Sequence, residues 1–110
     1  MQFEMTVGLL VVDHEKYAQY RAEIQTLLDA HGGRFRHDFE VARVLKSDAG
    51  HGINRLFVIQ FPDRAQKERF FVDSHYVEVR ARLFEEAVTG WTVIAECDCE
   101  SAGSGRVSFS

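Results

Sequence analysis

Hydrophobic and polar residues alternate at the start of the chain in the manner of a β-strand. Every second residue from Phe3 is apolar, and the stretch ends at Val12 in four consecutive apolar residues; a period of two is typical of a strand with one buried face. Residues 17–31 then carry apolar side chains at spacings of three and four, which predicts one face of a helix. Asp13 is a good N-cap for that helix, and Gly32 predicts its end in a left-handed conformation.

Two further strands follow the first predicted helix. Apolar residues alternate over residues 35–41 and the phase then slips, so we expect a strand with a bulge near Val41. Residues 47–54 are rich in turn formers, and residues 55–61 are nearly all apolar and rich in β-forming residues. The two strands are therefore expected to form a hairpin with a mobile tip.

The remaining pattern predicts a second helical region and a fourth strand. Asp63 begins a capping-box-like helix start, and Asp73-Ser74 is typical of a second N-cap that divides this region into two pieces. The second piece carries an apolar stripe and is expected to end at Gly90. Alternation resumes over residues 91–97, which predicts the last strand.

The order strand, helix, strand, strand, helix, strand predicts an α+β fold of the ferredoxin-like βαββαβ type. Right-handed crossovers put both helices on one face of a four-stranded antiparallel sheet. The other face carries apolar residues too, so we expect a second copy of the chain to cover it as a homodimer, a dimeric α/β barrel. This domain is expected over residues 1–98, followed by a Ser- and Gly-rich tail over residues 99–110.

Composition and charge narrow the classes of function. Hydrophobic residues make up 45% and charged residues 27% of the chain, as in ordinary globular proteins. A net charge of -4 without any Lys/Arg block argues against binding to nucleic acid or to an anionic membrane. No leader pattern and no membrane-spanning apolar run is found, so a cytoplasmic location is expected. Cys97 and Cys99 are two residues apart, a spacing that in a strand is close to the distance limit for a disulfide. They do not indicate a secreted protein stabilised by disulfides.

Several residues are candidates for a small-molecule site. His37 lies among apolar neighbours on the second predicted strand and imidazole titrates near neutrality, so His37 is the candidate catalytic base, with a satisfied core histidine as the alternative. Tyr17 and Tyr20 lie one turn apart on the helix face that meets the sheet, where their hydroxyls can orient a ligand or serve core packing alone. Arg34 can bind a carboxylate or form a cross-strand ion pair.

Phe61 and Tyr76 complete the expected cleft between helices and sheet. Tyr76 stands at the start of the second helical piece. It can contact an anionic ligand at the helix N-terminus, but the geometry of helix capping explains its position equally well. The histidines show no paired metal-ligand spacing, and the two cysteines offer only half of a zinc site. Because nucleophile-elbow and dinucleotide motifs are also missing, we expect neither a metal nor another cofactor.

Four short segments together resemble a known family: Tyr17-Ala-Gln-Tyr20, His31-Gly-Gly-Arg-Phe35, Phe61-Pro62 before a helix, and Asp73-Ser-His-Tyr76. The combination is similar to the domain-of-unknown-function family thirteen-thirty, within the dimeric α/β-barrel superfamily. That resemblance implies the fold and the dimer, but the family has no established activity. Its superfamily relatives include cofactor-independent monooxygenases, haem-degrading proteins, lactone isomerases and ligand-sensing dimer domains, which share a fold without sharing chemistry.

Two functions therefore stay open at this point. One is a cofactor-independent enzyme, monooxygenase-like or isomerase-like, acting on a small organic acid or aromatic compound. The alternative is a non-catalytic metabolite-binding or stress-related dimer. The enzyme predicts a pocket with at least one strongly perturbed titratable group, and the binding protein predicts an apolar pocket without convergent acid and base.

Overall fold

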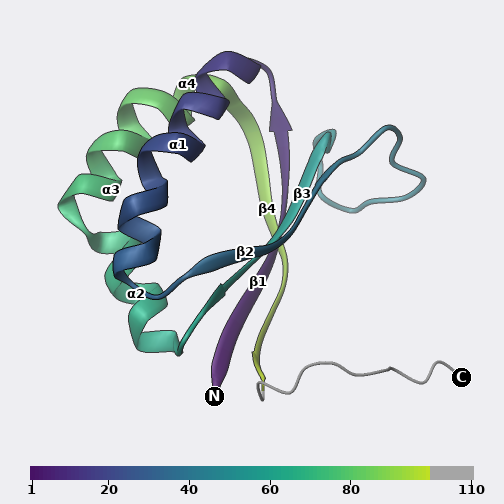
Figure 1. Cartoon of the computed structure of the whole chain (residues 1–110). Helices are drawn as coiled ribbons and strands as arrows, with labels where there is room; N and C mark the ends of the chain where they lie inside the picture. The colour runs from purple at the N-terminus through teal and green to yellow at the C-terminus, as the bar shows by residue number, and fades with distance from the viewer. Residues whose placement is uncertain (100–110) are drawn as a thin grey trace, which may run out of the picture.

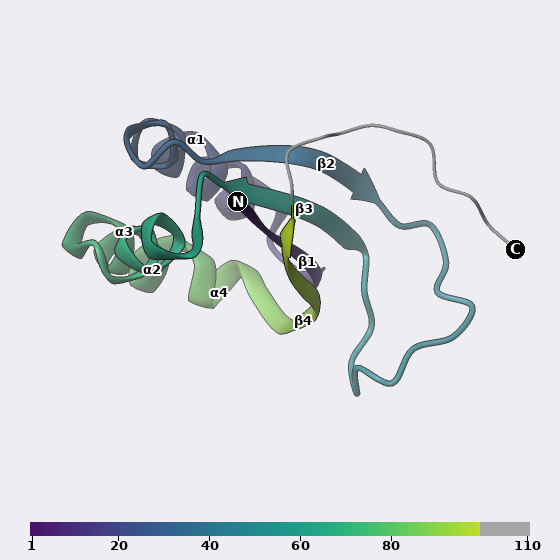
Figure 2. The same cartoon turned by 90° about the horizontal axis from the view of Figure 1, so that it is seen from below.

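The helices lie on one face of a single sheet. The computed structural model describes residues 1–99. The elements in chain order are β1 (Gln2–Val11), α1 (His14–Ala30), β2 (Arg34–Glu40), β3 (Arg55–Phe61), α2 (Arg64–Val72), α3 (Ser74–Val79), a π-helical turn η1 (Arg80–Phe84), α4 (Glu85–Ala87) and β4 (Val88–Cys99). The strand order is β2-β3-β1-β4 with antiparallel neighbours, which confirms the predicted ferredoxin-like α+β fold (Figures 1 and 2).

Side-chain caps begin the main helices where the sequence predicts them. The carboxylates of Asp13, Asp63 and Asp73 each accept a hydrogen bond from a backbone N–H two or three residues further along the chain. Each bond satisfies a backbone donor that has no partner inside its helix. Gly32 follows α1 with φ of 72°, the left-handed conformation expected there. The predicted helix starts, the end of α1 and the break at Asp73 are therefore confirmed.

The core lies between the sheet and the helices, on the side that we call the covered face. Alternate residues of β1, from Phe3 to Val11, are buried there. Ile24 and Leu28 of α1 and Phe70 of α2 pack over them. Burial of each such side chain contributes about 1.5–3 kcal/mol relative to exposure, so this layer accounts for most of the hydrophobic stabilisation.

The bulge of β2 lies at Arg36 and not near Val41. Phe35 pairs with Ile59 of β3, whereas His37 pairs with the next residue of β3, so Arg36 is the extra residue. A slip of one residue moves every following side chain to the other face of a strand. The expectation that His37 shares an apolar face with Phe35 is therefore wrong. Phe35 is on the covered face and His37 is on the opposite one.

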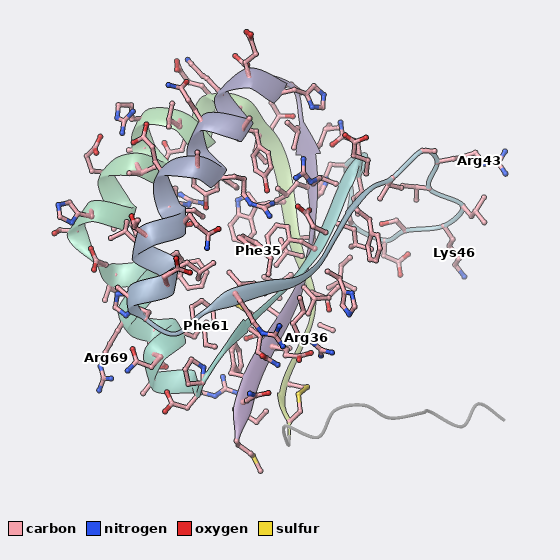
Figure 3. The ribbon with its side chains drawn as sticks, viewed as in Figure 1. Phe35, Arg36, Arg43, Lys46, Phe61 and Arg69 are labelled. Atoms are coloured by element: carbon pink, nitrogen blue, oxygen red, sulfur yellow. A yellow bond between two sulfur atoms is a disulfide. The ribbon has the colours of Figure 1, made fainter. Side chains whose placement is uncertain are left out.

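We call that opposite side the bare face. Its residues on β1 are Glu4, Thr6, Gly8 and Leu10, and their strand partners share the face. The β2–β3 loop, residues 41–54, projects on this side of the sheet, with Arg43 and Lys46 at its tip (Figures 1 and 3). The base of the loop is held by the Asn54 side chain, which bonds both the N–H and the C=O of Val11 at 2.8 and 2.9 Å.

The same loop covers one end of the bare face. Ile53 lies against Gly8, where an added Cβ would come within 2.8 Å of the Ile53 side chain. Next to it, His51 Nε2 lies 2.7 Å from Thr92 Oγ1, and the His51 ring covers Gly90. Glycine at these two strand positions lets the loop approach the sheet closely.

The last helical piece ends earlier than the sequence pattern predicts. The expected end at Gly90 is wrong, because α4 ends at Ala87 and β4 begins at Val88, which pairs with Val11. β4 continues to Cys99, and a disulfide joins Cys99 to Cys97 within the strand. The rest of the expected tail, residues 100–110, lies outside the described residues. In residues 1–99 no helix is long and apolar enough to cross a membrane.

Candidate functional site

A cavity of about 350 Å³ lies between the covered face and the helices. Its wall is mostly apolar: β1 contributes Met5, Val7 and Leu9, and α2 contributes Phe70 and Phe71. Cavities of this size accept small organic ligands, and apolar walls are typical of such sites. The cavity is therefore the candidate functional site of the chain.

Three tyrosines, which are all the tyrosines of the chain, line this cavity. Tyr17 and Tyr20 stand one turn apart on α1, which Asp13 caps, and their ring centroids are 5.7 Å apart. Tyr76 comes from α3, on the opposite side of the cavity from the sheet, and is 4% exposed. The structure thus brings together Tyr17, Tyr20 and Tyr76, as the sequence predicts for a cleft between helices and sheet.

The hydroxyl groups of Tyr20 and Tyr76 form a buried pair. Their oxygens are 2.9 Å apart, and either can be the donor. One hydrogen bond uses one of the two hydroxyl protons. Among the described residues the second O–H has no acceptor, so it is available to an acceptor atom of a molecule in the cavity.

Burial keeps these tyrosines protonated. It raises the pKa of Tyr20 well above its usual value, and the neighbouring Tyr76 hydroxyl adds to that effect. Burial also raises the pKa of Tyr76, an effect that the Tyr20 hydroxyl and the Arg80 guanidinium partly offset. For Tyr17 the dominant cause is again burial, opposed by Arg21. At neutral pH the tyrosines are therefore hydrogen-bond donors and not bases.

An ion-pair cluster stands beside Tyr17 at one end of the cavity. Asp38 accepts hydrogen bonds from Arg21 at 2.8 Å and from Arg55 at 2.8 and 2.9 Å. Burial opposes ionisation of Asp38, but the bonds from Arg55 and Arg21 outweigh it and lower its pKa. The Arg21 guanidinium lies 3.6 Å from the centre of the Phe35 ring. This cluster covers Tyr17 and Phe35 and fixes the β2 edge against α1.

Charged residues that sequence reasoning missed stand on the cavity wall. They are Lys67 of α2, Arg80 of η1 and Glu96 of β4. For Arg80 a signal existed, because Tyr76, Arg80 and Phe84 are spaced by four residues and so share one helix face.

The other candidate residues lie outside the cavity wall. Phe61 is 1% exposed and packs against Phe70 in the core, with ring centroids 5.6 Å apart. Arg34 donates to Gln60 on the bare face at 3.2 Å. His37 is exposed and stacks on Phe39 with a centroid distance of 5.9 Å, so it does not face the tyrosines.

No metal-binding cluster is found within residues 1–99. No group of at least three His, Cys, Asp or Glu side chains in that range has the arrangement needed to hold an ion. The polar groups on the cavity wall are the tyrosine hydroxyls, the Trp91 indole N–H, two cations and one carboxylate.

Sequence comparison identifies a family but no characterised relative. No curated protein sequence matches the chain. The family profile described as "Domain of unknown function (DUF1330)" matches residues 6–97. The matched range begins within β1 and ends within β4, so it contains all the elements between these two strands and every cavity-wall residue except Met5.

Solved structures share the fold at low sequence identity. A protein of unknown function from Rhodopseudomonas palustris has a TM-score of 0.76 and 15% identity, with 91% of this chain and 83% of that chain covered. A dimeric ferredoxin-like protein of unknown function from Jannaschia sp. has a TM-score of 0.62 and 12% identity over 90% and 100% of the two chains. The hydroxynitrile lyase of Passiflora edulis has a TM-score of 0.63 and 14% identity over 94% and 97%.

Proposed function

The chain belongs to the DUF1330 family, and we propose that it is a homodimeric protein that binds a small, mostly apolar metabolite in the cavity of each subunit. The family description assigns no activity, so the proposal rests on the site. The observation that carries it is the buried Tyr20–Tyr76 hydroxyl pair inside an otherwise apolar cavity of about 350 Å³. A few placed polar groups in an apolar wall are what orient a bound ligand.

Binding is favoured over base catalysis by the chemistry of the polar groups. Tyr20 and Tyr76 have raised pKa values and stay protonated at neutral pH. His37, the candidate base of the sequence analysis, is on the bare face. A general base must reach the proton that it removes, so a base at His37 would not serve a ligand in this cavity.

Acid catalysis in the same cavity is the second candidate function. The free O–H of the tyrosine pair can donate a proton or a hydrogen bond to a substrate oxygen on which negative charge develops. One protein that shares the fold, the hydroxynitrile lyase of Passiflora edulis, is an enzyme. A shared fold does not transfer chemistry, so this candidate depends on turnover being measured.

The homodimer is supported by the residues of the bare face. Phe39 is 52% exposed there, and its strand partner Leu56 and the neighbouring Val58 are only half-buried. A sheet face with such residues is normally covered. The related proteins of this fold from Jannaschia sp. and Bacteroides fragilis are described as dimeric, and a second copy of the chain fits the same role here.

The binding proposal is tested with Trp91, the single tryptophan of the chain, which stands on the cavity wall. We expect 2-phenylethanol and its larger homologues to change the fluorescence of Trp91 with saturation. Val93→Phe narrows the cavity and should weaken this binding, whereas the matched control Val72→Phe, on an exposed part of α2, should not. Equal binding by the two variants would place the ligand elsewhere and contradict the proposal.

The dimer proposal is tested by sedimentation velocity at micromolar concentration. Phe39→Glu puts a charge on the bare face and should convert the dimer to monomer. Val77→Glu makes the same change at an exposed valine of α3, 51% exposed, and should leave the dimer intact. A wild-type monomer, or loss of the dimer in Val77→Glu alone, would exclude an interface on the bare face.

A further inference from the structure

Arg80 brings a guanidinium group to the wall of the cavity. It is the first residue of η1, a single turn of π-helix. Such turns are rare and occur frequently at functional sites. Its guanidinium carbon lies 4.9 Å from the centre of the Phe84 ring and 6.0 Å from that of Trp91, and both aromatic residues also line the cavity. Arg80 is thus held between two rings at the boundary of the cavity.

Most of the hydrogen-bonding capacity of Arg80 is left for another partner. Its ion-pair partner among the described residues is Glu85, at 3.3 Å, and the Glu85 side chain is 59% exposed. A guanidinium has five N–H donors, and the long contact to Glu85 and the contact to the Tyr76 hydroxyl use at most two of them. Exposed ion pairs of this kind contribute little to stability, so a second anion can compete for Arg80.

We infer that the ligand of the cavity is a small monocarboxylate, with its carboxylate on Arg80 and the Tyr20–Tyr76 hydroxyl pair and its apolar body against the aromatic wall. This inference rests on the proposed binding function and names the class of its ligand. A carboxylate has two oxygens that accept several hydrogen bonds, and guanidinium groups bind carboxylates with two parallel bonds. The remaining tyrosine O–H supplies a further donor to the same group.

The charges around the cavity agree with an anionic ligand. On the wall itself, Lys67 and Arg80 carry two positive charges and Glu96 carries one negative charge; Glu85, which pairs with Arg80, lies outside the wall and its side chain is 59% exposed. Arg80 is also close enough to the Tyr76 hydroxyl to lower its pKa against the effect of burial. The cation and the hydroxyl pair therefore belong to one polar end of an otherwise apolar cavity.

The test compares phenylacetate with 2-phenylacetamide, a neutral analogue of nearly the same shape, by isothermal titration calorimetry at neutral pH. Charge-assisted hydrogen bonds are roughly twice as strong as those between neutral groups, so we expect the wild-type protein to bind the carboxylate at least about tenfold more tightly than the amide. Arg80→Gln should abolish this preference while binding of the amide persists. Arg80→Lys should retain part of it, and the matched control Arg69→Gln, at an exposed cation of α2 outside the cavity wall, should retain all of it.

The outcomes separate the inference from the proposed function. Equal binding of the two probes by the wild-type protein overturns the carboxylate inference and leaves the binding function standing. A preference that survives in Arg80→Gln and disappears in Lys67→Gln assigns the anion to Lys67 and also overturns it. If neither probe binds, and chain-lengthened acids and amides do not bind either, the proposed function itself fails. An unchanged thermal transition of the amide-binding Arg80→Gln variant shows that its fold is intact.

Discussion

The covered face and the bare face belong to one sheet and both carry apolar strand residues, but their surroundings differ. On the covered face Phe3 is 0% exposed, and a full helical layer packs over it. On the bare face Phe39 is 52% exposed, and within residues 1–99 only the loop of residues 41–54 reaches across one end. Within one chain, the covered face therefore has a packed core with a cavity, whereas the bare face still lacks a partner.

The polar residues of the two faces differ in a way that fits this interpretation. On the bare face, Glu4 accepts hydrogen bonds from Arg36 at 2.6 Å and from Gln60 at 2.7 Å, and Gln60 accepts one from Arg34 at 3.2 Å. This network satisfies the buried Gln60 amide, which both donates and accepts, while its two arginines are exposed to solvent. The tyrosine pair of the covered face leaves one donor free. Unused hydrogen-bonding capacity inside an apolar cavity points to a ligand, whereas a satisfied network beside exposed apolar residues is typical of the rim of an interface.

The largest effect is expected from Phe3→Ala, which removes a fully buried ring from the covered face. Such changes destabilise by about 3–5 kcal/mol, because they lose transfer free energy and leave a cavity. Phe39→Ala on the bare face should lower the free energy of unfolding of a monomer much less. Its effect should increase with protein concentration, because the dimer then forms. Denaturant unfolding at several protein concentrations measures both. Equal, concentration-independent losses would show that the two faces do not differ as described.

The second prediction concerns the attachment of the loop to the sheet. Asn54→Ala removes both hydrogen bonds to the backbone of Val11, which is 2% exposed. A buried backbone group left without its partner costs about 1–3 kcal/mol, so we expect a loss of stability in this range and faster hydrogen exchange at the end of β1. Ser47→Ala, at an exposed position in the same loop, is the matched control and should change stability by less than about 0.5 kcal/mol.

The element order, the Asp caps and the Gly32 helix end could all be predicted from the sequence, because each depends on residues close together along the chain. The bulge position could not. Whether β2 slips at Arg36 or near Val41 depends on the pairing of β2 with β3, and on contacts made only in the folded chain. In the observed register Phe35 reaches the core and Asp38 reaches Arg21 and Arg55.

The register of β2 against β3 also explains which residues of the candidate site could be predicted from the sequence. The tyrosines of α1 and α3 were placed on one cavity by helical spacing, which the fold preserves. His37 was placed by strand alternation, which a bulge reverses. The spacing of Arg80 from Tyr76 and Phe84 indicates a shared helix face, but it does not distinguish an arginine that lines a cavity from one that extends to solvent. Local patterns therefore predict which helix face meets the sheet better than which strand face does.

A third, smaller effect is expected from the tyrosine pair of the covered face. Tyr20→Phe leaves the Tyr76 hydroxyl without its partner, and Tyr76→Phe does the reverse. Each change should cost about 1 kcal/mol of the free energy of unfolding, and the double variant should cost less than the sum, with a coupling energy of at least about 0.5 kcal/mol. The cycle of Tyr17→Phe with Tyr76→Phe is the control, because Tyr17 bonds Arg21 instead. Coupling of equal size in both cycles would contradict a specific hydroxyl pair.

The smallest effect near neutral pH, and the one most specific to the covered face, is the titration of the tyrosines. The three tyrosines of the chain all line the cavity, and burial raises the pKa of each above the usual value of 10.0. Each tyrosine has a higher pKa in the folded state than in the unfolded state. Its contribution to stability is therefore fully present below a pH of about 10 and is lost as the pH rises through the folded-state pKa. We therefore expect that the tyrosines do not change the free energy of unfolding between pH 7 and 9, and that they lower it above that range.

Absorbance at 295 nm, which reports ionised tyrosine, measures this titration. It should stay low in the folded protein at pH 10 and rise on unfolding. A tyrosine that ionises near pH 10 in the folded protein would show that one of the three is accessible to water and that the cavity is less closed than its walls indicate.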